Sequence, residues 1–88
     1  IGYWHGYPRH LSNNADVLVR GQRAPILGRV SMDMIVVDLT GIKGAAVGDV
    51  VTVLGGAVSA DELADRADTI NYEIVTRLNP LMRRIYLN

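Results

Sequence analysis

Cysteine is absent from this sequence, and neither sign of charge is in excess. The 88 residues include nine basic and nine acidic side chains. Without cysteine there is no disulfide scaffold, no thiol nucleophile and no cysteine-ligated zinc or iron–sulfur site. Balanced charge argues against a nucleic-acid partner, because such proteins usually concentrate basic residues on one face. The only two histidines, His5 and His10, lie near one end, so we predict no metal site.

Long apolar runs are also missing. None approaches the roughly 20 residues that a membrane-spanning helix needs, so we expect no membrane partner. The chain begins at Ile1 with neither an initiator methionine nor a signal-peptide pattern, which suggests a segment cut from a longer protein. Apolar residues make up 49% of the sequence, enough for a packed core. Since so small a domain buries only about 60–65% of its unfolded surface, we expect a neighbouring domain or partner.

The first two thirds of the chain read as strands. Apolar and β-branched runs predict them at residues 16–20, 23–30, 32–39 and 50–54. Gly21-Gln22 has the chemistry of a type II′ hairpin turn, and Gly48-Asp49 predicts another turn. The continuous run at 32–39 is typical of a strand covered on both faces. Residues 1–4 and 83–87 also look strand-like.

The period changes after residue 58. Ser59 and Glu62 have the spacing of a capping box, which predicts a helix over residues 60–68. Asn71 is expected to cap a second short helix that runs through Leu78 and ends before Pro80. The predicted fold class is mainly β: a small antiparallel β-barrel or sandwich with two short helices near the C-terminus.

Three segments are candidates for chemistry. The turn around Gly6 and Pro8 would present Tyr3 and Arg9 together, although an aromatic cover over a barrel end explains the same residues. Arg29, with Ser31 and Asp33 close behind it, would suit a rim that faces a small anion, or a β-bulge with a surface ion pair. These readings stay open on spacing alone.

The third candidate is Tyr72, near a predicted helix start. Its hydroxyl could contact a phosphate there, or its ring could pack the helix onto the barrel. Lys43, the only lysine, lies between glycines in a loop and is expected to be solvated, not a desolvated nucleophile. The sequence contains no acid–base carboxylate pair, nucleophile elbow or glycine-rich phosphate loop, so we assign no catalytic residue.

Five motifs in order resemble one family. The motifs are Gly2-Tyr3-x-x-Gly6-Tyr7-Pro8-Arg9, Pro25-Ile-Leu-Gly-Arg-Val-Ser-Met-Asp33, Gly48-Asp49, Ser59-x-Asp-Glu62 and Thr69-Ile-Asn-Tyr72-Glu73. In this order they resemble the C-terminal domain of alanine racemase, a pyridoxal-phosphate isomerase, and the similarity extends throughout the chain.

The resemblance implies a two-domain enzyme of which residues 1–88 are the β domain. An N-terminal (β/α)8 barrel, absent from this chain, would hold pyridoxal 5'-phosphate on a lysine. Two subunits would pair head to tail, so that each β domain completes the partner's site. The implied reaction interconverts L-alanine and D-alanine in the cytoplasm, and D-alanine is a peptidoglycan precursor.

The resemblance also implies site roles. Met32 matches the methionine whose backbone N–H meets the substrate carboxylate, and Tyr72 matches a tyrosine that contacts the cofactor phosphate and narrows the channel. Tyr3 matches a second tyrosine of that constriction. The remaining matches line the access channel further out: Arg9, Arg29 and Ile70.

Both catalytic bases of the family fall outside this chain. The tyrosine base belongs to a Ser-Tyr-Gly-type segment before Ile1, and the cofactor lysine belongs to the barrel. We therefore predict that the isolated chain is inactive and binds no cofactor covalently. His5 departs from the family pattern, which usually has aspartate at this position.

Two alternatives remain at this level. A non-enzymatic small β-barrel interaction module would use the aromatic patch from Tyr3 to Tyr7 to grip a peptide or another protein. A different pyridoxal-phosphate racemase or decarboxylase with a similar β domain is the other, and the Ser-Met-Asp and Ile-Asn-Tyr-Glu motifs argue against it.

Overall fold

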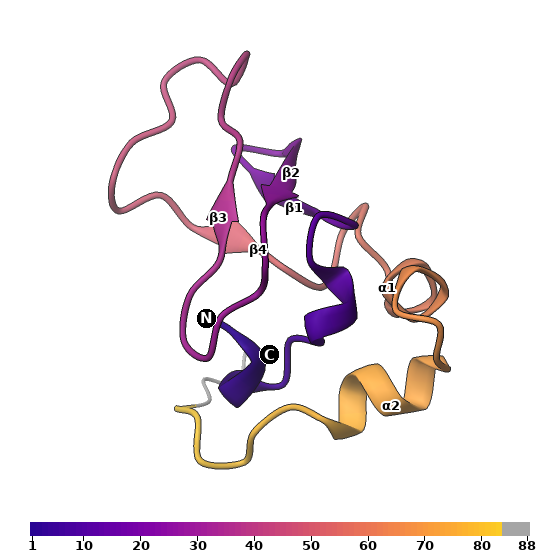
Figure 1. The fold of residues 1–88 in the computed structure, drawn as a ribbon. Coiled ribbons are helices and arrows are strands. Elements are labelled where there is room, and N and C mark those ends of the chain that lie inside the picture. Colours follow the sequence, from indigo (N-terminus) through magenta and orange to yellow (C-terminus); the bar gives the residue numbers. More distant parts are fainter. Residues whose placement is uncertain (84–88) are drawn as a thin grey trace.

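The computed structural model describes residues 1–83, whose strands form one curled antiparallel sheet. Strands β1 (Asp16–Val19) and β2 (Gln22–Leu27) form a central hairpin. The edges are β3 (Val36–Val37) beside β2 and β4 (Val51–Thr52) beside β1, so the order is β3-β2-β1-β4 (Figure 1). The predicted mainly β fold is confirmed as a half-barrel with two edges.

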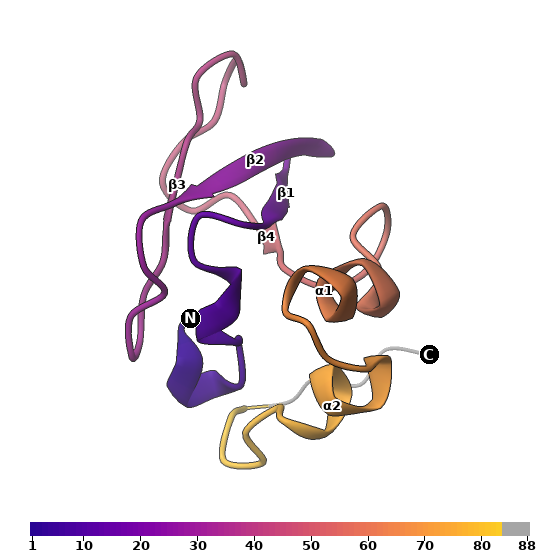
Figure 2. The same ribbon diagram turned by 45° about the vertical axis from the view of Figure 1, so that its right-hand side comes forward.

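Short helices come before and after the strands along the chain. The 3₁₀ helices η1 (Tyr3–His5) and η2 (Arg9–Leu11) precede it. Helices α1 (Ala60–Arg66) and α2 (Asn71–Thr76) follow it and lie together below the hairpin (Figure 2). The two predicted helices near the C-terminus are thus confirmed.

One apolar core joins the hairpin, η2 and both helices. Alternate residues of the hairpin strands point into it, as the period of two requires. Leu11 and Leu63 fill it from η2 and α1 and are almost fully buried. The hairpin members are Val17, Val19, Ala24 and Ile26.

The hairpin turn lies one residue earlier than predicted. Val19 pairs with Gln22, which leaves Arg20 and Gly21 as the turn residues. Both have positive φ, 52° and 74°, and only a type I′ turn requires this at both central positions. The predicted hairpin is confirmed, and the predicted type II′ turn at Gly21-Gln22 is wrong.

Residues 32–39 are less regular and less covered than predicted. Only Val36 and Val37 pair as a strand. Val36 is 57% exposed and Met34 58%, so the prediction of cover on both faces is wrong within the described residues. An apolar run indicates which residues tolerate burial, whereas packing decides which are buried.

Two further local predictions need correction. The strand-like opening is η1 from Tyr3 onward, because Gly6 takes a left-handed φ of 103° and donates its N–H to the Tyr3 carbonyl. Asn71 is the first residue of α2 and does not cap it; the N-cap position belongs to Ile70. The Asn71 amide instead donates to Asp61 Oδ1 at 2.9 Å.

The start of α1 follows the sequence more closely. Ser59 Oγ accepts the Glu62 N–H at 3.0 Å, as predicted. α2 ends at Thr76, two residues before the predicted Leu78. The strand predicted at 83–87 lies outside the described residues apart from its first position. Within the described part, α1 and α2 span seven and six residues, and neither is long and apolar enough to cross a membrane.

Candidate functional site

The site is built around η1, which is hydrogen-bonded to the loop after β2. The Tyr3 N–H donates to the Ser31 carbonyl and the Trp4 N–H to the Met32 carbonyl, each at 2.9 Å. Gly2 makes this approach possible: a Cβ there would lie 2.2 Å from the Ser31 oxygen. Segments 28 residues apart in sequence therefore share one backbone contact surface.

A third segment, residues 77–79, is also hydrogen-bonded to η1. The Asn79 side-chain amide donates to the Trp4 carbonyl at 2.8 Å, and the Asn79 N–H donates to the His5 carbonyl at 3.1 Å. A Cβ at Gly6 would lie 2.3 Å from the Arg77 oxygen. We call residues 2–6, 31–33 and 77–79 the Tyr3 junction.

Beside this junction the surface is hollow and basic. The Arg9 guanidinium carbon lies 5.5 Å from the centre of the Tyr3 ring, within range of a cation–π contact. Both residues line a hollow of about 380 Å³, and a second of about 380 Å³ shares Arg9 with Arg29. We call the two together the basic groove. Its lining residues are Tyr3, Gly6, Tyr7, Pro8, Arg9, His10, Ser12, Arg29 and Arg77.

Three predicted channel residues thus line the two hollows of the basic groove. Met32 lines neither hollow, but its backbone is hydrogen-bonded to η1, which carries Tyr3. The Met32 side chain is 53% exposed, while its carbonyl accepts the Trp4 N–H. No hydrogen bond within residues 1–83 uses the Met32 N–H, which leaves this donor available to an anion.

The other two predicted residues lie on a separate element, at the start of α2. Tyr72 is 76% exposed and Ile70 is 63% exposed, so packing of the Tyr72 ring onto the barrel is excluded within the described chain. No hydrogen bond within residues 1–83 joins them to Met32. A cleft of about 160 Å³, lined by Pro8, His10, Thr69, Glu73 and Arg77 among others, connects α2 to the basic groove.

Glu73 of α2 is in contact with residues at both ends of the helix. The Thr69 hydroxyl donates to the Glu73 carboxylate, and Arg77 lies 3.1 Å from the same carboxylate. The hydrogen bond from Thr69 and then the positive charge of Arg77 lower the pKa of Glu73. Glu73 therefore stays ionised and partly neutralises Arg77, so Arg9 and Arg29 supply most of the groove's positive charge.

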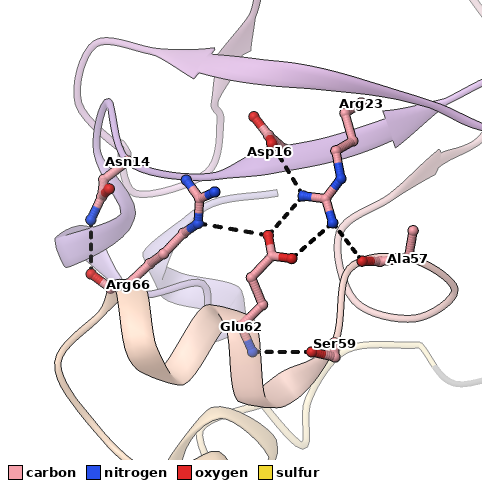
Figure 3. Close-up of polar contacts among 7 residues, drawn as sticks. All are labelled: Asn14, Asp16, Arg23, Ala57, Ser59, Glu62 and Arg66. Atoms are coloured by element: carbon pink, nitrogen blue, oxygen red, sulfur yellow. Dashed lines mark hydrogen bonds and ion pairs between the residues drawn. The ribbon is translucent and has the colours of Figure 1, made fainter.

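A second polar cluster, centred on Arg23, braces the hairpin against α1 (Figure 3). Its guanidinium donates to both Glu62 oxygens at 2.8 Å, to Asp16 at 3.2 Å and to the Ala57 carbonyl at 2.7 Å. The hydrogen bond from Arg23 lowers the pKa of Glu62 and raises that of Arg23. Because one arginine holds both carboxylates and joins the hairpin to α1, this cluster is structural and not an acid–base pair.

Sequence reasoning missed two contributors to the basic groove. His10 follows Arg9 in η2, and Arg77 comes from the far end of α2. Arg77 carries no local sequence signal, since only the Tyr3 junction brings it near. Tyr7 lines the same hollow but is buried, and burial raises the pKa of its hydroxyl. Among the described residues no three side chains of the metal-binding types come together, and Lys43 is exposed in its loop.

Comparison with known proteins decides between the open alternatives. Residues 1–86 match the family described as "Alanine racemase, C-terminal domain". The chain belongs to the alanine racemase C-terminal domain family. It is 46% identical over 92 aligned residues to alanine racemase of Leptospira interrogans and 50% identical to that of Halothermothrix orenii. Both alignments cover the whole chain and 24% of the relative.

Solved structures of the family have the same fold. Alanine racemase from Bartonella henselae, with covalently bound pyridoxal phosphate, superposes with a TM-score of 0.92 at 39% identity, covering 99% of this chain and 26% of that one. Biosynthetic alanine racemase from Pseudomonas aeruginosa gives 0.90 at 42%, covering 99% and 24%. The chain thus spans about a quarter of its relatives' length, and the family favours an enzyme domain over an interaction module.

Proposed function

We propose that this chain is the C-terminal domain of an alanine racemase and forms part of its substrate site. The observation that carries the proposal is the basic groove, whose two hollows are lined by Tyr3 and by Arg29 and share Arg9. The Met32 loop is hydrogen-bonded to the segment that carries Tyr3, and the Met32 N–H has no partner within residues 1–83. The substrate class is a small zwitterionic amino acid, L- or D-alanine. Its carboxylate is the group that this chain recognises.

The carboxylate is received in two stages. Exposed Arg9 and Arg29 raise the local concentration of an anion at the mouth of the groove. The Met32 N–H then donates a hydrogen bond to it, and a charge-assisted bond of this kind is roughly twice as strong as a neutral one. Tyr3 limits the width of the passage, and Ile70 supplies an apolar wall.

The residues present fit one edge of a pyridoxal-phosphate site. The exposed Tyr72 hydroxyl would donate to a phosphate oxygen, since its side chain has no hydrogen-bond partner within residues 1–83. Exposed Lys43 lacks the desolvation that a Schiff-base lysine needs. Bound pyridoxal phosphate acidifies the α-proton of the amino acid by withdrawing electrons. The groups that move this proton are not assigned to any residue of this chain.

The domain would act within a larger assembly. Strands β3 and β4 and the residues beside them expose Val36, Leu39, Val50 and Val51, and exposed apolar side chains are typical of contact surfaces where they cluster. This supports contact with an N-terminal barrel of the same enzyme and, in a homodimer, with the partner subunit's site. We infer a cytoplasmic enzyme that supplies D-alanine as a peptidoglycan precursor.

Alanine racemisation is the test. The full-length protein, incubated with pyridoxal phosphate and L-alanine, is expected to yield D-alanine by chiral chromatography. The 88-residue chain under the same conditions should yield no more than a cofactor-only control. A full-length protein that leaves L-alanine unchanged would overturn the proposed function, and racemisation by the chain alone would overturn the division of roles.

A further inference from the structure

We propose that His5 is a positioning residue, which holds Tyr3 in register with the Met32 loop by accepting a backbone hydrogen bond. The functional part of this inference rests on the proposed function. Its structural part rests on contacts within the Tyr3 junction alone.

The contact is a reciprocal closure of η1. His5 Nδ1 accepts the Gly2 N–H at 3.0 Å, and the His5 N–H donates to the Gly2 carbonyl at 3.0 Å. The first bond is the side-chain half of a capping box, in which the side chain three residues into a helix accepts the backbone N–H of the N-cap residue. The second is the backbone bond of a 3₁₀ turn, because Gly2 has no side chain to complete the box. Here an imidazole performs the part usually taken by Glu or Gln.

Two further contacts restrain His5. The ring is held edge-on to Trp4, with centroids 4.9 Å apart and planes at 82°. The Asn79 N–H donates to the His5 carbonyl. Side chain and backbone of His5 are therefore both restrained, as a residue that orients others must be.

His5 holds the Gly2 peptide, and this peptide fixes how η1 is aligned with the Ser31–Asp33 loop. Gly2 lies against the Ser31–Asp33 loop so closely that a Cβ would overlap backbone atoms. The next two N–H groups donate to Ser31 and Met32. If the Gly2 N–H lost its acceptor on His5, the Gly2 peptide would rotate toward a different hydrogen-bond acceptor. Tyr3 would then shift relative to Met32.

Two substitutions separate the hydrogen bond from the packing. In His5→Asn, the side-chain Oδ1 occupies the place of Nδ1 and still accepts from Gly2. In His5→Phe, the ring against Trp4 is kept and the acceptor is lost. Both are made in the full-length enzyme and compared with wild type at temperatures well below their melting points.

The expected kinetic result is a change in KM. His5→Phe should raise KM for alanine roughly tenfold with kcat within about twofold, a loss of about 1.4 kcal/mol in kcat/KM. His5→Asn should stay within about twofold of wild type in both constants. A merely structural role would instead reduce the active fraction, lowering apparent kcat at constant KM in both variants.

Hydrogen exchange read by mass spectrometry tests the bond without reference to activity. A peptide covering residues 1–7 should exchange faster in His5→Phe than in wild type or His5→Asn. Equal exchange in all three would overturn the structural part. Faster exchange with unchanged KM would overturn the positioning role alone, and a wild-type enzyme without racemase activity would overturn the proposed function instead.

Discussion

Valine is buried in the hairpin but exposed at the edges of the sheet. Val17 and Val19 of β1 are 0% and 2% exposed, whereas Val36 of β3 and Val51 of β4 are 57% and 44% exposed. β1 has strands on both sides and contributes to the core beneath it, while β3 and β4 are two-residue edges. Burial thus follows the number of neighbouring elements and not the hydrophobicity of the side chain.

The same division separates stability from function. The packed half comprises the inward faces of β1, β2, η2 and α1, which hold seven of the fourteen buried hydrophobic residues among those described. The open half comprises the edge strands and the exposed residues of the candidate site, including Arg9 on the outer face of η2. If this comparison is correct, substitutions in the packed half change the free energy of unfolding, and those in the open half change ligand binding.

The largest expected effect comes from truncating a buried side chain and comparing it with an exposed one. Leu11→Ala, at a fully buried position, should lower the free energy of unfolding by about 3–4 kcal/mol. Val36→Ala, at an exposed position, should lower it by less than about 0.5 kcal/mol. Urea unfolding of the 88-residue chain, followed by circular dichroism, measures both. Equal losses would mean that β3 belongs to the same core.

The Tyr3 junction is the next test, because it joins the two halves. Gly2→Ala forces a Cβ into the Ser31–Asp33 backbone and should destabilise the chain by about 2–3 kcal/mol. Gly28→Ala is the matched control: it has open space around it but a φ of 75°, so only left-handed strain of about 1 kcal/mol is expected. The same unfolding assay ranks them, and a Gly2→Ala loss below that of Gly28→Ala would contradict the close contact.

A smaller effect on binding is expected from Tyr72→Phe in the full-length enzyme. Loss of the hydroxyl removes one charge-assisted hydrogen bond to the phosphate and should weaken cofactor retention about tenfold, or about 1.4 kcal/mol. The exposed ring predicts an unchanged melting temperature. Cofactor absorbance after dialysis gives the retention. Unchanged retention with lower thermal stability would identify Tyr72 as a packing residue.

The smallest effect concerns pH and the Arg23 cluster. The hydrogen bond from Arg23 lowers the pKa of Glu62 below its ordinary value of 4.5. A carboxylate whose pKa is lowered by folding stabilises the folded chain at pH values above its ordinary pKa. This contribution is lost as the pH falls through the folded-state pKa. The urea midpoints of wild type and Glu62→Gln should therefore differ most above pH 4.5 and converge on acidification.

The control for this experiment lies on the same helix. Asp65 is exposed, and Asp65→Asn removes a carboxylate that takes no part in the Arg23 cluster. Its midpoint should follow that of wild type at every pH. A pH-independent difference for Glu62→Gln would mean that the carboxylate charge contributes nothing to the brace between hairpin and α1.

Local signals predicted the elements whose determinants lie close together in sequence. The β1–β2 hairpin and the start of α1 at Ser59 follow from runs and caps of a few residues. The turn type and the N-cap of α2 were wrong because each depends on a one-residue register that composition does not specify. At Asn71 the amide bonds to Asp61 on the neighbouring helix, a contact no local pattern contains.

The candidate site was predicted as residues but not as an arrangement. Tyr3, Arg9 and Arg29 do line one groove, whereas Tyr72 and Ile70 lie on a separate element. Arg77 and His10 entered the groove only through the fold. Their roles toward alanine and the cofactor stay predictions for the experiments above.

The order of the motifs determined the family, and the periodicity determined that strands precede two helices, because both are properties of neighbouring residues. Tertiary structure alone decided which valines are buried, that Gly2 must approach Ser31, and that His5 accepts the N–H of Gly2. The physical reason is range: Asn79 donates to the carbonyl of Trp4 across 75 residues, and contacts of that separation form only when the whole chain has folded.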